Sequence, residues 1–61
     1  MLKEYDVCID QEYGIGEYIV KAENKRDLIA KLRRTFPDDI GADAYAIDPD
    51  TGDEFGINWG K

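Results

Sequence analysis

The stretch KEYDVCID, residues 3–10, decides the fold because its side chains alternate between two chemical kinds. Tyr5, Val7 and Ile9 are bulky and apolar, whereas three of the four even-numbered residues are acidic. Successive side chains of a β-strand point to opposite faces, so this alternation predicts a strand with one buried and one wet face. A wet face implies that a second layer covers only the other side of the sheet.

The flanking sequence predicts three more strands. Residues 17–22 are rich in β-forming side chains and follow a loop at residues 11–16, which contains two glycines. Residues 43–48 and 53–59 alternate again, and the segment PDTG at 49–52 is typical of a turn. The two pairs of strands therefore form two hairpins.

A helix is predicted between the hairpins, over residues 25–36. Asn24 is placed to cap it by accepting a hydrogen bond from the backbone N–H of Asp27. Leu28, Leu32 and Phe36 recur at four-residue spacing and give the helix one apolar face. The proline that follows Phe36 disfavours helical geometry there and ends the helix.

The element order is therefore ββαββ, which predicts one α+β domain over residues 1–61, a two-layer sandwich with the helix on one face of a four-stranded mixed sheet. A right-handed return through the helix would place the first and last strands parallel in the middle. In length, element order and the six-residue span 48–53 between the last strands, the chain resembles the immunoglobulin-binding domains of protein G, a β-grasp fold. The resemblance is one of layout, so it implies a fold and no antibody binding.

The composition argues against an enzyme and against a cofactor or metal. The 61 residues include no histidine and one cysteine, Cys8, so neither a histidine base nor an intrachain disulfide is available. Cys8 is interpreted as a small filler and Trp59 as a core residue over the helix. No leader or membrane-spanning run is recognised, and with one free thiol a cytoplasmic location is expected.

The charges are distributed unevenly along the chain. The net charge is −6, yet residues 25–36 carry +4 and the remainder carries −10. The strand alternation predicts that Tyr45 and Ile47 face the helix together with the other bulky residues. The opposite face is then expected to carry the acids Glu4, Asp6, Asp10, Glu17, Asp48 and Glu54.

This acidic face has two interpretations. Same-face residues of a strand lie roughly 6.6 Å apart, a scale comparable to that of phosphates along a nucleic-acid strand. The face could therefore imitate nucleic acid and occupy a basic cleft of a partner protein. Alternatively, the carboxylates only solvate the uncovered side of a two-layer domain. The acids of the segment 48–54 are similarly interpreted as a hairpin turn and not as a cation site.

Three classes of function remain from the sequence. The first is a non-enzymatic module that binds a basic protein through the acidic face, with Tyr13 in the first loop as an additional contact residue. The second is an assembly role as a homodimer joined through sheet edges. The third is weak nucleic-acid binding through the basic helix, which the overall negative charge disfavours. The candidate residues for that third role are Arg26, Lys31, Arg33 and Arg34.

Overall fold

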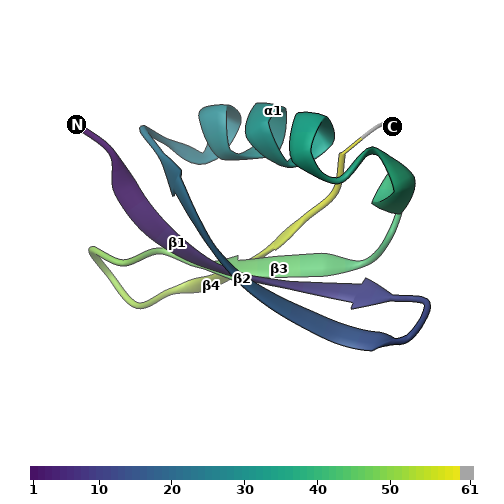
Figure 1. Ribbon diagram of the computed structural model, residues 1–61. Coiled ribbons are helices and arrows are strands. Elements are labelled where there is room, and N and C mark those ends of the chain that lie inside the picture. The colour runs from purple at the N-terminus through teal and green to yellow at the C-terminus, as the bar shows by residue number, and fades with distance from the viewer. Residues whose placement is uncertain (60–61) are drawn as a thin grey trace.

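The computed structural model describes residues 1–59 and has two layers, a four-stranded sheet and one helix packed on one of its faces (Figure 1). The predicted α+β class and ββαββ order are confirmed. The elements are β1 (Lys3–Gln11), β2 (Gly14–Ala22), α1 (Lys25–Thr35), the 3₁₀ turn η1 (Pro37–Asp39), β3 (Ala44–Ile47) and β4 (Glu54–Ile57).

The first hairpin is tighter than the sequence predicted. Gln11 pairs with Gly14, so only Glu12 and Tyr13 connect β1 to β2, and β2 begins three residues before the predicted boundary. Gly14 has a φ of 129°, a conformation that L side chains rarely adopt, and this allows the short connection. The glycines that suggested a loop therefore belong to the strand itself.

Helix α1 begins after Asn24 and ends at Phe36, as the sequence predicted. Asn24 Oδ1 accepts a hydrogen bond of 2.9 Å from the backbone N–H of Asp27, and Asp27 Oδ2 in turn accepts one of 2.9 Å from the N–H of Glu23. The first bond satisfies an amide that the first helical turn leaves free, and the second holds the Asp27 carboxylate against the residue before the cap. Phe36 leaves helical geometry, with φ −123° and ψ 63°, directly before Pro37.

The sheet is antiparallel throughout, and its strand order is β2-β1-β3-β4. The prediction of a mixed sheet with neighbouring first and last strands was wrong. The segment from β2 through α1 crosses over β1 and brings β3 to the free edge of β1. The hairpin at residues 48–53 then places β4 outside β3. An inner position for β4 would require β3 to leave the width of one strand free beside β1.

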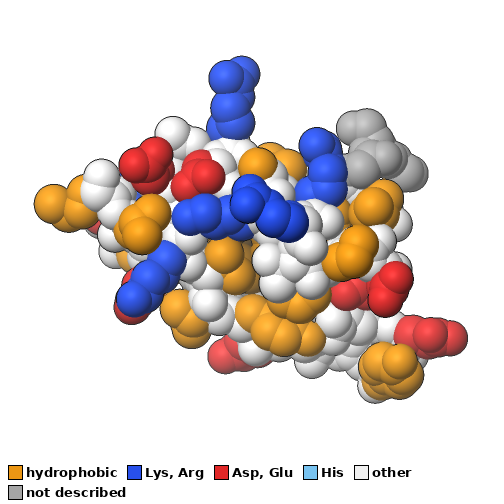
Figure 2. Space-filling model, turned by 45° about the horizontal axis from the view of Figure 1, so that its top comes forward, with side chains coloured by type: hydrophobic (Ala, Val, Ile, Leu, Met, Phe, Trp, Pro, Cys, Tyr) orange, Lys and Arg blue, Asp and Glu red, His pale blue; other side chains and the backbone are white. Residues whose placement is uncertain are grey.

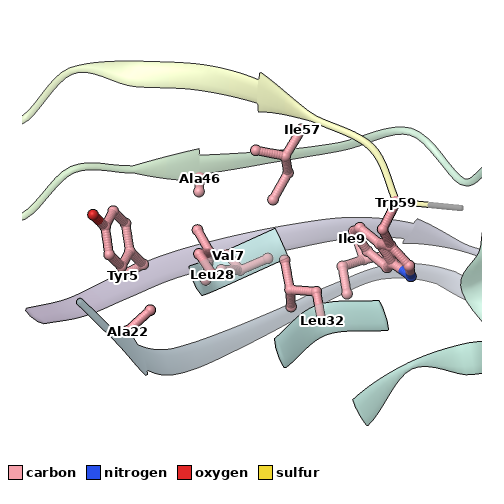
Figure 3. Close-up of a cluster of buried hydrophobic side chains, with 9 residues drawn as sticks. All are labelled: Tyr5, Val7, Ile9, Ala22, Leu28, Leu32, Ala46, Ile57 and Trp59. Atoms are coloured by element: carbon pink, nitrogen blue, oxygen red, sulfur yellow. The ribbon is translucent and has the colours of Figure 1, made fainter. Parts of the chain in front are cut away.

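The core lies between the sheet and α1 and takes its residues from every strand and from the helix (Figure 3). Its members are Tyr5, Val7, Ile9, Ala22, Leu28, Leu32, Ala46, Ile57 and Trp59. All the predicted core residues of β1 are among them. In β3, however, the core residue is Ala46, because it pairs with the buried Val7 and so shares its face.

The inward position of Ala46 corrects the predicted orientation of β3. Tyr45 and Ile47 were expected to face α1, but they stand on the opposite side of the sheet. A small residue is suited to the core here because Ala46 lies beside Phe55 of β4. The Tyr5 and Phe55 rings meet edge to face with their centroids 6.2 Å apart, so two aromatic rings fill the space that a larger residue 46 would need.

Trp59 fastens the end of the described chain to the end of α1. Its side chain is fully buried, as predicted, and its indole Nε1–H donates a 3.0 Å hydrogen bond to the Phe36 carbonyl. The Trp59 carbonyl accepts a 3.0 Å hydrogen bond from the N–H of Gly41. Trp59 therefore supplies apolar area and also satisfies a carbonyl at the C-terminal end of the helix.

Replacing Trp59 with phenylalanine tests this double role. Trp59→Phe keeps a ring but removes one of the two donors to the Phe36 carbonyl, which still accepts a 3.2 Å hydrogen bond from the N–H of Asp39. We therefore expect a loss of about 0.5–1.5 kcal/mol in the free energy of unfolding. Trp59→Ala also removes the ring and should lose about 3–5 kcal/mol. Urea unfolding followed by circular dichroism measures both. A Trp59→Phe variant as stable as the native chain would contradict the role of the hydrogen bond.

Candidate functional site

The face of the sheet opposite α1 is not covered by any element of the described chain (Figure 1). Residues that pair across neighbouring strands share a face, so the register of β1 with β2 and β3, and of β3 with β4, assigns its members. We call it the open face. It comprises Glu4, Asp6, Cys8, Asp10, Ile15, Glu17, Ile19, Lys21, Tyr45, Ile47 and Glu54.

Five of the six acids predicted for this face do lie on it. They are Glu4, Asp6, Asp10, Glu17 and Glu54. Their carboxylates are distributed over β1, β2 and β4, and the single lysine among the open-face residues is Lys21. The open face is therefore strongly acidic.

Asp48 is the exception. Because Ile47 occupies the open face, residue 48 falls on the side of α1, where it lines a depression with Tyr5, Lys25 and Phe55. Asp48 Oδ1 accepts a 2.8 Å hydrogen bond from the N–H of Asp50 and so holds the hairpin turn. The inclusion of Asp48 in the acidic face was wrong for the same reason as the orientation of Tyr45.

Large apolar side chains stand between the acids, which the sequence interpretation missed. Ile15 and Ile19 are 72% and 63% exposed, and Tyr45 is 38% exposed. Asp6 pairs with Ile19 on one side and with Ile47 on the other, so an aliphatic side chain flanks it on each neighbouring strand. In the run YIV at 18–20, Ile19 points to one face of the sheet and its two neighbours point to the other. Because all three residues are apolar, the sequence did not indicate which face is exposed.

Asp6 is the most unusual group of the open face. Its Oδ1 is shielded from solvent and, within residues 1–59, has no hydrogen-bond partner. A shielded carboxylate oxygen without a donor is unfavourable, because it has lost hydration and gained nothing in return. A hydrogen-bond donor that reached this atom from outside the sheet would stabilise it.

Cys8 and Tyr45 meet beside Asp6, in the middle of the open face. They are paired across β1 and β3, and Cys8 is buried as expected for a filler. The pKa of Tyr45 is raised above its ordinary value, first by its polar contact with the Cys8 side chain and then by electrostatic interaction with the same side chain. Burial and the carboxylates of Glu54 and Glu17 act in the same direction.

The remaining candidate residues lie outside the open face or at its end. Tyr13, at the tip of the β1–β2 hairpin, is 95% exposed and contributes nothing to the core. Arg26 and Arg33 flank a shallow apolar groove on α1, where Figure 2 shows basic side chains gathered on the helix side of the molecule. Arg34 is also exposed.

Lys31 does not belong with these arginines. Its Nζ donates a 2.9 Å hydrogen bond to the Lys21 carbonyl and lies 3.3 Å from Asp27 Oδ2. Lys31 therefore ties α1 to β2, and its placement on an outward basic face was wrong. Asp27 and Lys31 are four residues apart and therefore lie next to each other on the helix surface.

No group of three or more histidine, cysteine or acidic side chains within residues 1–59 is arranged to hold a metal ion. The helices in this part of the chain are too short and too polar to cross a membrane. No family model, curated protein or solved structure matches the chain. None of these comparisons supports the resemblance to protein G domains, and the antiparallel order β2-β1-β3-β4 departs from the mixed sheet that the resemblance implied. Function therefore has to be argued from the open face itself.

The orientation of β3 can be tested by placing the same charge on adjacent residues. Ala46→Lys buries an ammonium group in the core without a partner and should unfold a domain of this size. Tyr45→Lys places the same group on the open face and should change the free energy of unfolding by under about 1 kcal/mol. Circular dichroism of both variants decides the matter. A folded Ala46→Lys variant and an unfolded Tyr45→Lys variant would reverse the assignment.

The position of Tyr45 beside the Cys8 side chain predicts that the Tyr45 phenol ionises late. Because the folded pKa of Tyr45 is raised, its contribution to stability is complete below the ordinary tyrosine pKa and is lost as the pH rises through the folded value. Near-ultraviolet titration of the native chain minus that of Tyr45→Phe should give one phenol with a midpoint above 10.0, the ordinary value. A midpoint at or below that value would refute the contact.

Proposed function

We propose that this chain is a non-enzymatic binding module that engages a basic protein through its open face. The observation that carries the proposal is the shielded, unpaired Oδ1 of Asp6 between the aliphatic side chains of Ile19 and Ile47. A lysine or arginine of a partner would supply the missing donor. The exposed Ile19 and the half-buried Ile47 would then pack against the apolar stem of that side chain.

The composition of the open face is suited to a protein partner. Protein interfaces combine buried apolar and aromatic contacts with a polar surround. Ile15, Ile19 and Tyr45 provide the first, and the neighbouring carboxylates provide the second. A face that served only to keep the domain in solution would gain nothing from large exposed apolar side chains among its charges. The mixture therefore favours the binding interpretation over simple solvation.

A narrower form of the proposal is that the basic partner handles nucleic acid and that the acids imitate phosphates. Glu4 and Asp6 are same-face neighbours on β1, roughly 6.6 Å apart. Cys8 interrupts the row before Asp10, and isoleucines stand on both sides. These features support contact with a basic protein surface more strongly than faithful imitation of a phosphate backbone.

The proposal can be tested by capturing partner proteins from a cell lysate with two double variants. One changes charges on the open face, and the other changes charges elsewhere. Glu17→Lys/Glu54→Lys places cations on β2 and β4 of the open face. The control Asp38→Lys/Asp53→Lys changes the net charge equally on residues outside that face. We expect the native chain and the control to retain basic proteins that salt releases, and the open-face variant to lose them.

Two results of this experiment would contradict the proposal. One is that the native chain retains no basic protein. The other is that both double variants behave alike, which would reduce the effect to net charge. For the narrower form, duplex DNA is added to the captured complex. Displacement of the partner supports imitation of nucleic acid, whereas an unchanged complex limits the proposal to a basic protein surface.

A further inference from the structure

The outer surface of α1 and the open face both combine apolar side chains with charged ones, and their charges have opposite signs. On the outer side of α1, Ile29 and Ala30 form the floor of a shallow groove, and Lys25, Arg26 and Arg33 flank it. Figure 2 shows hydrophobic side chains between basic ones on this side. The open face also presents apolar side chains, but acids surround them.

We propose that copies of this chain associate head to tail, with the outer surface of α1 from one copy seated on the open face of the next. This inference is independent of the proposed function, because it requires no other protein. It assigns a second copy of the chain as an occupant of the open face, which a basic partner of suitable shape would then have to displace.

Charge complementarity favours this arrangement over a dimer joined by two open faces. The open face carries five carboxylates and one lysine, so two such faces would oppose like charges at short range. The α1 groove carries three cations and no acid among its lining residues. A second copy that docks through α1 therefore brings opposite charges together and covers Ile19 and Tyr45 at the same time.

The unpaired oxygen of Asp6 adds a second, independent reason. It needs a donor that can reach between Ile19 and Ile47. The guanidinium groups of Arg26 and Arg33 offer several N–H donors on long apolar stems. Either side chain from another copy can lie along the isoleucines while its head group meets the carboxylate. No donor within residues 1–59 reaches this oxygen in a single copy.

The positions of the two surfaces determine the kind of assembly. Helix α1 covers one face of the sheet and the open face is the other, so the surfaces point away from each other (Figure 1). After a first contact, one copy still has a free open face and the other still has a free α1 surface. Such head-to-tail contacts continue into larger assemblies or close into a ring, whereas a symmetric dimer through sheet edges stops at two copies.

A charge exchange within the chain tests the proposal. Arg26→Glu/Arg33→Glu makes the α1 groove acidic, and Glu17→Lys/Glu54→Lys makes the open face less acidic. Each pair alone should weaken self-association about tenfold, because a surface charge pair contributes modestly and its reversal repels. The chain that carries all four substitutions keeps the native net charge of −6. It should regain association, since the acidic groove now faces an open face that carries three lysines in place of one.

Sedimentation velocity over rising concentrations, up to about 1 mM, measures the association. We expect the native chain to grow beyond a dimer, or to close into a ring, and to dissociate as salt is added. Circular dichroism controls for folding, and Arg26→Gln/Arg33→Gln should weaken association in the same direction without reversing charge. A native chain that stays monomeric, stops at two copies, or is not rescued by the fourfold exchange would overturn the proposal.

Discussion

One helix of three turns has to cover a sheet of four strands, and the rest of the structure follows from this constraint. An α-helix with its side chains is about 10 Å wide, and neighbouring strands lie about 4.8 Å apart, so α1 can bury only the middle of one face. The middle is β1, where Tyr5, Val7 and Ile9 are packed against Leu28 and Leu32. Every residue that alternates with them is left on the uncovered side.

The small core explains why Trp59 and Phe55 are needed at its borders. Trp59 closes the end near η1 and bonds to the Phe36 carbonyl. At the other end, Lys25 Nζ lies 4.4 Å from the centroid of the Phe55 ring, which covers an aromatic group that α1 does not fully enclose. Aromatic residues supply large buried area per side chain, which suits a domain that has little interior.

The charges contribute little to holding the fold together. Lys3 and Asp50 form a 2.8 Å ion pair, but both side chains are substantially exposed, and exposed pairs are worth about 0–1 kcal/mol. The acids of the open face have even less to gain from the fold, since only Lys21 offers an opposite charge among the open-face residues. The stability of the fold therefore does not explain their arrangement, and the unpaired oxygen of Asp6 is unfavourable for it.

Much of the fold could be predicted from local signals, and the errors had one common cause. The cap of Asn24, the end of α1 before Pro37 and the alternation in β1 depend on neighbouring residues alone. The orientation of β3 depends on its pairing with β1, and strand AYAI has apolar residues at every position. The large side chains of Tyr45 and Ile47 therefore suggested that these residues face α1, which was wrong. The same error placed Asp48 on the open face.

The sequence predicted most of the acids of the open face but not its isoleucines. Ile15 and Ile19 belong to a strand whose two faces both carry apolar residues, so alternation alone could not separate them. The strand order likewise required knowledge of which edge of β1 the returning chain reaches. The loop glycines were ambiguous too, because Gly14 permits a tight turn as readily as a loose one.

The assignment of faces in β3 underlies everything argued about the open face, and nuclear Overhauser effects test it most directly. Contacts between the Ala46 methyl group and the Leu28 or Leu32 methyl groups are expected, with none from the Tyr45 ring to α1. The opposite pattern, with the Tyr45 ring close to α1 and Ala46 remote from it, would contradict the open face as described.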